Sequence, residues 1–162
     1  MKLGELCRNK GIILLYHNHD FEFSKMPDGR YALNFLYDRI PSRILQTELD
    51  TCWISVSGED PASYVEKYAG RAPLVHGKDY VEQKSEHMYG LIGLPKSSEK
   101  SSNGFAFRAV GDGVMNFPAI LRAAQKAGTK WLVVEQDEHS VISALEDARR
   151  SIQFLRNLEK SK

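Results

Sequence analysis

Four short, mostly apolar runs alternate along the chain with longer segments of helical pattern, and this alternation constrains the fold more than any other feature. The runs cover residues 12–16, 44–49, 72–75 and 131–134. We interpret them as strands buried on both faces, which occur in parallel sheets covered by helices. The sequence therefore predicts an α/β fold, either a four-stranded open α/β sandwich or part of a (β/α)8 barrel.

The segments around these runs carry helix signals. We expect helices over residues 1–10, 34–40, 59–68, 117–127 and 141–158. Asp60 followed by Pro61 is typical of the start of a helix, and Gly128 is typical of an end.

The chain has 162 residues, enough for one domain, and its 42% hydrophobic and 27% charged residues are ordinary globular usage. We expect a single domain over residues 1–162. A polar stretch around residues 82–104 has no periodicity, and we interpret it as a surface insertion, either a lid or a plain loop.

Composition and simple motifs exclude several classes of protein. With 22 Lys and Arg against 21 Asp and Glu, the net charge of +1 gives no electrostatic footprint for nucleic acid or an anionic membrane. The two cysteines, Cys7 and Cys52, form no CxxC pair, so a reducing compartment is expected. No apolar stretch has the length of a membrane span, and no GxGxxG or GxxxxGK[ST] motif occurs where a nucleotide site needs one. We expect a soluble, cytoplasmic protein that binds neither nucleic acid nor membrane.

Each apolar run ends in carboxylate or imidazole side chains. These are His17 and His19 after the first run, Asp50 after the second, His76 after the third and Glu135 after the fourth. Alone, Asp50 would be a turn or helix-cap residue and His76 a hydrogen-bonded loop residue. The carboxyl ends of parallel strands meet at one edge of the sheet, where α/β barrels place their active sites. Carboxylates and imidazoles at the ends of all four strands together predict a site for a divalent metal. Their oxygen and nitrogen atoms are suitable ligands for Mn²⁺, Zn²⁺, Co²⁺ or Mg²⁺.

Five segments carry a resemblance to a known family. They are YHNHDFEF (16–23), ELDTCW (48–53), GRAPLVHGKD (70–79), AVGDGVMNFPAIL (109–121) and WLVVEQDE (131–138). Together they resemble the sugar phosphate isomerase/epimerase family, which has the xylose-isomerase-like TIM barrel fold and is similar also to the AP-endonuclease barrels.

This resemblance implies that the chain corresponds to the fifth to eighth strands of the barrel. A whole barrel takes about 250 residues, so four β/α units and an insertion fit this length. We therefore predict half of a (β/α)8 TIM barrel, whose sheet would keep two uncovered edges. Two chains related by a two-fold axis could complete the barrel, and we predict this homodimer; a truncated chain that stays monomeric or aggregates is the alternative.

The resemblance also implies roles for individual residues. Asp50, His76 and Glu135 match the family's ligands for a divalent metal, with His19 or His17 as the fourth ligand. Many members of the family have a glutamate where this chain has His17, so a mechanism with two glutamates does not transfer directly.

The implied reaction is isomerisation or epimerisation of a small sugar, keto-sugar or sugar phosphate through an enediolate. A metal polarises the carbonyl and stabilises the enediolate. Glu135 would act as the base, His17, His19 or Glu22 would return the proton, and Lys78 would neutralise the oxyanion. The residues expected to contact substrate are Glu22, Trp53 and Arg108.

Three other functions fit parts of the pattern. A dehydratase or lyase would use the same proton abstraction to expel a β-hydroxyl group. A nuclease of the AP-endonuclease type would need a basic surface, which the net charge of +1 argues against. A degenerate half-barrel would bind metal or ligand without turnover.

Overall fold

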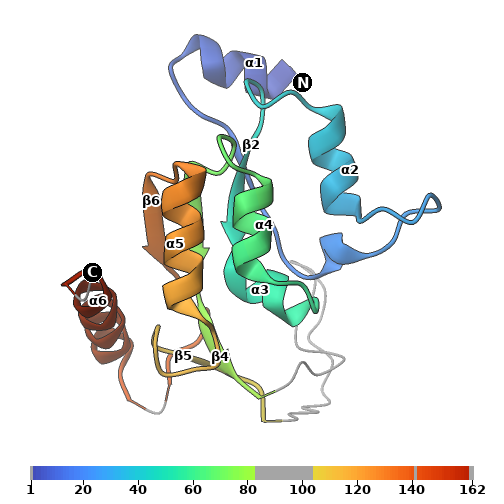
Figure 1. Ribbon diagram of the computed structural model, residues 1–162. Helices are drawn as coiled ribbons and strands as arrows, with labels where there is room; N and C mark the ends of the chain where they lie inside the picture. The colour runs from blue at the N-terminus through green and yellow to red at the C-terminus, as the bar shows by residue number, and fades with distance from the viewer. Residues whose placement is uncertain (1, 83–103, 141, 161–162) are drawn as a thin grey trace. The chain divides into compact units, whose positions relative to one another are not determined.

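The chain forms two compact units in the computed structural model, which describes residues 2–82, 104–140 and 142–160 (Figure 1). The first unit comprises Met1–Gly77 and Asn116–Glu135, and the second comprises Lys78–Met115 and Gln136–Lys162. Nearly all of the insertion expected around residues 82–104 lies outside the described residues.

The first unit is built on a parallel sheet of four strands. The strands are β1 (Leu15–His17), β2 (Gln46–Asp50), β3 (Leu74–Gly77) and β6 (Trp131–Val134). They lie in the order β1-β2-β3-β6, and every neighbouring pair is parallel. The parallel α/β sheet expected from the sequence is confirmed, although β1 begins at Leu15, where pairing with Gln46 starts, and not at Ile12.

Helices precede and connect these strands. They are α1 (Lys2–Asn9), the 3-10 turn η1 (Phe21–Phe23), α2 (Ala32–Arg39), α3 (Thr51–Val56), α4 (Pro61–Lys67) and α5 (Phe117–Ala127). The expected start of α4 is confirmed, because the Asp60 carboxylate accepts the backbone N–H of Ser63 and Pro61 is the first helical residue. Gly128 ends α5 with φ +75°, a left-handed conformation that glycine adopts without strain.

Helices α4 and α5 pack side by side over one face of the sheet (Figure 1). Leu49 of β2 and Val75 of β3 point to this face and are fully buried, together with Val65 of α4. Gly77 allows α5 to approach closely, since a Cβ atom there would lie 3.2 Å from the ring of Phe117. These contacts form the core that holds the strand ends in place.

The opposite face of the sheet is more exposed. Its side chains alternate with the buried ones along each strand, so Trp131 and Val133 of β6 are 67% and 39% exposed while Leu132 packs against the core. Burial of every strand on both faces, as predicted from the sequence, is therefore wrong for β6, because the helices of this unit cover one face. We call the side that carries His17, Glu48, His76, Trp131 and Val133 the open face.

The second unit contains two antiparallel strands and a long helix, namely β4 (Asp79–Val81), β5 (Ala106–Arg108) and α6 (Ala144–Lys160). The buried carboxylate of Asp79 accepts backbone N–H groups from Gly111, Gly113 and Met115, and this organises the loop that follows β5. Among the described residues, no helix is long and apolar enough to cross a membrane.

Candidate metal centre

Four side chains meet at the carboxyl edge of the sheet in the first unit. His17 and Asp50 end β1 and β2, His76 lies near the end of β3, and Glu135 directly follows β6. One nitrogen or oxygen atom from each lies within 4.8 Å of the other three. The structure thus brings together the residues at the ends of four strands, as the sequence predicts for a parallel sheet.

Asp50 is held rigidly in this group. Its carboxylate Oδ1 accepts the backbone N–H groups of Cys52 and Trp53, at 2.9 and 3.1 Å, and so caps α3. Its own backbone N–H donates to Oδ1 of Asn18 at 3.0 Å. The Oδ2 atom lies 3.3 Å from Nε2 of His17. Asp50 therefore acts as a helix cap through one oxygen and faces the other three residues through the second.

His76 lies between two carboxylates. Its Nδ1 is 2.8 Å from Oε2 of Glu135, and its Nε2 is 2.9 Å from Oε1 of Glu48. Glu48 was not among the site residues expected from the sequence. Its spacing of two residues from Asp50 was the available signal, because side chains two apart on a strand point to the same face.

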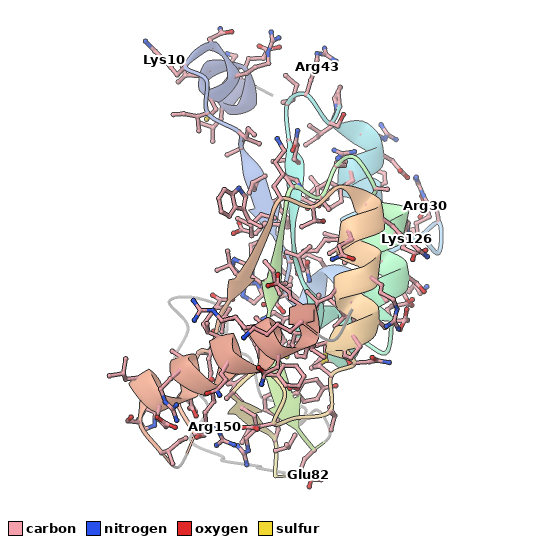
Figure 2. All side chains as sticks on the ribbon, turned by 60° about the vertical axis from the view of Figure 1, so that its left-hand side comes forward. Lys10, Arg30, Arg43, Glu82, Lys126 and Arg150 are labelled. Atoms are coloured by element: carbon pink, nitrogen blue, oxygen red, sulfur yellow. The ribbon has the colours of Figure 1, made fainter. Side chains whose placement is uncertain are left out.

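His17 carries the positive charge of this group. Burial lowers its pKa, but hydrogen bonding and Coulombic attraction from Asp50 and Glu135 outweigh that effect and raise the pKa to about 9. Figure 2 shows Lys10 and Arg43 at the other end of the unit, where the strands begin. These two side chains therefore do not neutralise the carboxylates of Asp50 and Glu135.

The donor set fits a divalent metal. Two carboxylates and two imidazoles converge at a point where a positive charge is needed, and nitrogen and oxygen donors of this kind bind Mn²⁺, Co²⁺, Zn²⁺ and Mg²⁺. Of the two histidines considered for the fourth position, His17 belongs to the group and His19 lies beside it, with ring centroids 4.9 Å apart.

The other expected site residues of the first unit have defined surroundings. Glu22 is buried, and its two oxygens accept the hydroxyl of Tyr16 and the backbone N–H of His19 at 2.7 and 2.9 Å. Trp53 is buried, and its ring centroid lies 5.6 Å from that of His19. Glu22 therefore holds the backbone of His19, and Trp53 packs near its ring.

Lys78 and Arg108 belong to the second unit. The Lys78 side chain is buried, and its Nζ donates to both carboxylate oxygens of Asp137 at 3.0 and 3.2 Å. Arg108 donates to the backbone carbonyl of Phe107. Lys78 thus pairs with Asp137, while its sequence neighbour Asp79 binds backbone N–H groups.

Fold and site together define an α/β protein with a candidate metal centre at the carboxyl edge of a parallel sheet. Residues 1–158 match the family model described as xylose isomerase-like TIM barrel. The chain belongs to this family, as the motifs in the sequence imply.

Curated relatives of this chain are enzymes. An inosose dehydratase from Clostridium beijerinckii is 28% identical over 148 residues, which cover 88% of this chain and 46% of that protein. An inosose dehydratase from Bacillus thuringiensis is 27% identical over 161 residues, covering 95% and 50%. The chain spans about half the length of the curated relatives it matches.

Solved structures give the same fold. A sugar phosphate isomerase/epimerase from Parabacteroides distasonis superposes with a TM-score of 0.72 and 25% identity, covering 94% of this chain and 48% of that one. An L-ribulose 3-epimerase superposes with a TM-score of 0.65 and 15% identity, covering 99% and 51%, and supports the fold alone.

Proposed function

We propose that the protein is a divalent-metal-dependent enzyme that removes the proton next to a carbonyl group of a small sugar, keto-sugar or sugar phosphate. The observation that supports this best is the group of His17, Asp50, His76 and Glu135 at the carboxyl edge of the sheet. In α/β barrels, this edge is where residues from several strands form the active site.

The residues of the group have separable roles in this proposal. Asp50, His76, Glu135 and His17 would hold the metal, which supplies an electrophile that stabilises enediolate charge. Glu135 is the base, since its side chain is 37% exposed while that of Asp50 is buried and caps α3. His19, beside His17, would return the proton, because both oxygens of Glu22 already accept hydrogen bonds.

Isomerisation or epimerisation is the reaction expected from the family resemblance. It requires the proton removed by Glu135 to be returned to a carbon or oxygen of the same enediolate. Contact of Lys78, Arg108 and Trp53 with substrate stays a prediction from the family resemblance.

Dehydration is the second candidate, and it is favoured by the inosose dehydratases among the relatives. Glu135 would remove the same α proton, and the β-hydroxyl group would take up a proton and leave as water. This reaction needs one base and one acid, and does not need the second glutamate that this chain lacks at position 17.

One experiment separates these reactions. The Mn²⁺-loaded protein is incubated in D₂O with ketoses and, separately, with an inosose, and the products are followed by NMR. Deuterium at the α carbon with a new epimer or aldose supports isomerisation, and loss of water supports dehydration. Glu135→Gln should abolish either reaction. Metal binding without exchange on any substrate would leave the degenerate half-barrel as the better account and refute an enzymatic role.

We propose further that the chain forms half of a barrel and that a second copy covers the open face. Trp131 and Val133 are exposed there on β6, an edge strand of the sheet. Strand β1 is the other edge, and a two-fold axis would set β6 of each copy beside β1 of the other, in the parallel direction of a closed barrel. The second copy would then supply the wall of the substrate site.

Analytical ultracentrifugation tests this assembly. The wild-type protein should sediment as a dimer, and Trp131→Glu should sediment as a monomer because a charge would be placed in the interface. Leu145→Glu, at an exposed position of α6, is the control and should remain dimeric. A monomeric wild-type protein would refute the proposed dimer without affecting the metal centre.

A further inference from the structure

The two ring nitrogens of His76 face different surroundings. Nδ1 lies 2.8 Å from Oε2 of Glu135, which is one of the four candidate ligands. Nε2 faces Glu48, whose Oε1 lies 2.9 Å away and which does not belong to that group. Both distances are those of charge-assisted contacts between nitrogen and oxygen.

A neutral imidazole has one N–H donor and one nitrogen lone pair. A lone pair that faces a carboxylate at less than 3 Å is repelled, so either a proton or a metal ion must lie between Nδ1 and Glu135. On the Nδ1 side, Oε2 of Glu135 lies 3.5 Å from Nε2 of His17, which in turn lies 3.3 Å from Oδ2 of Asp50, so this is the side on which a metal would be held. When a metal takes the lone pair of Nδ1, the single N–H of His76 lies on Nε2, toward Glu48.

We propose that Glu48 is a positioning residue of the metal centre. It accepts the Nε2–H of His76, fixes the orientation of the ring and leaves the lone pair of Nδ1 directed at the metal. Histidine ligands of metals commonly donate their second ring N–H to a carboxylate, which orients them and increases their basicity. This inference rests on the metal centre proposed above and adds a residue to it.

The pairing of strands β2 and β3 places Glu48 and His76 on the same face of the sheet. Glu48 and Asp50 lie two residues apart on β2, and Asp50 pairs directly with His76 of the neighbouring strand β3. The same strand therefore supplies one candidate ligand and the partner that orients another. The Glu48 side chain is 25% exposed, so its contact with His76 is partly shielded from water and is stronger than it would be at an open surface.

Cobalt binding tests the inference in the full chain. Titration of Co²⁺ into the metal-free protein gives a dissociation constant and a visible absorption spectrum that reports ligand geometry. Glu48→Gln removes the charge and retains an acceptor oxygen, while Glu48→Leu removes both. We expect Glu48→Leu to bind Co²⁺ about 10–100-fold more weakly with an altered spectrum, and Glu48→Gln to fall between it and the wild type. Glu66→Gln, at an exposed position of α4, is the matched control and should bind like the wild type.

The outcomes separate this inference from the proposed function. Wild-type affinity and an unchanged spectrum in Glu48→Gln and Glu48→Leu would overturn the role of Glu48 and leave the metal centre intact. A wild-type protein that binds no Co²⁺ would overturn the metal centre and the inference together. If Glu48→Leu does not fold, Glu48→Gln still decides, since an unchanged dissociation constant there contradicts the proposal.

Discussion

Metal binding should release a proton from His17, because the metal and the proton compete for the same nitrogen. The pKa of His17 in the metal-free protein is raised to about 9 by Asp50 and Glu135, against the effect of burial. At pH 7.5, which is roughly 1.5 units below that pKa, removal of the proton costs about 2 kcal/mol. Metal affinity should therefore rise about tenfold per pH unit between roughly pH 6.5 and 8.5 from this group alone.

Isothermal titration calorimetry measures this proton. Mn²⁺ is titrated at pH 7.5 in two buffers with different heats of ionisation, and the difference in apparent enthalpy gives the number of protons released. We expect about one proton from the wild type and close to none from His17→Gln. His139→Gln, at an exposed histidine of the second unit, should release as much as the wild type. Equal proton release by wild type and His17→Gln would refute the reasoning.

Two further predictions concern stability. In metal-free protein, the raised pKa of His17 means that its stabilising interaction is fully present below its ordinary pKa of 6.5 and is lost as pH rises through about 9. The difference in melting temperature between wild type and His17→Gln in chelator should thus shrink between pH 6.5 and 9.5; a constant difference would contradict it. Asp79→Ala should lower the free energy of unfolding by about 3 kcal/mol, because the buried N–H of Tyr80 and three partly buried N–H groups of residues 111–115 would lose their acceptor. Urea denaturation measures this loss, and a change below roughly 1 kcal/mol would show that water replaces the carboxylate.

Much of the first unit could be predicted from local patterns. Helix α5 and strand β6 have the predicted bounds, since Pro118 and Gly128 delimit the helix and the run at residues 131–134 is continuous. The convergence of Asp50, His76 and Glu135 follows from strand direction alone, because each lies at the carboxyl end of a parallel strand.

The remaining features depend on contacts between distant parts of the chain. Asp79 binds N–H groups 32 to 36 residues away, so no local pattern predicts the loop after β5 that it organises. His17 and His19 were equivalent by strand alternation, but β1 ends at His17 and alternation does not extend beyond a strand. The spacing of Glu48 from Asp50 indicates that both point to one face, but the contact of Glu48 with His76 depends on how β2 pairs with β3.

The metal content of the purified protein tests the central claim most directly. Elemental analysis after chelator treatment and reloading should find about one divalent ion per wild-type chain. An Asp50→Asn, His76→Ala double variant should bind none, although the introduced asparagine can still cap α3 through its side-chain oxygen. Absence of metal from the wild type, or equal metal in the double variant, would contradict the account.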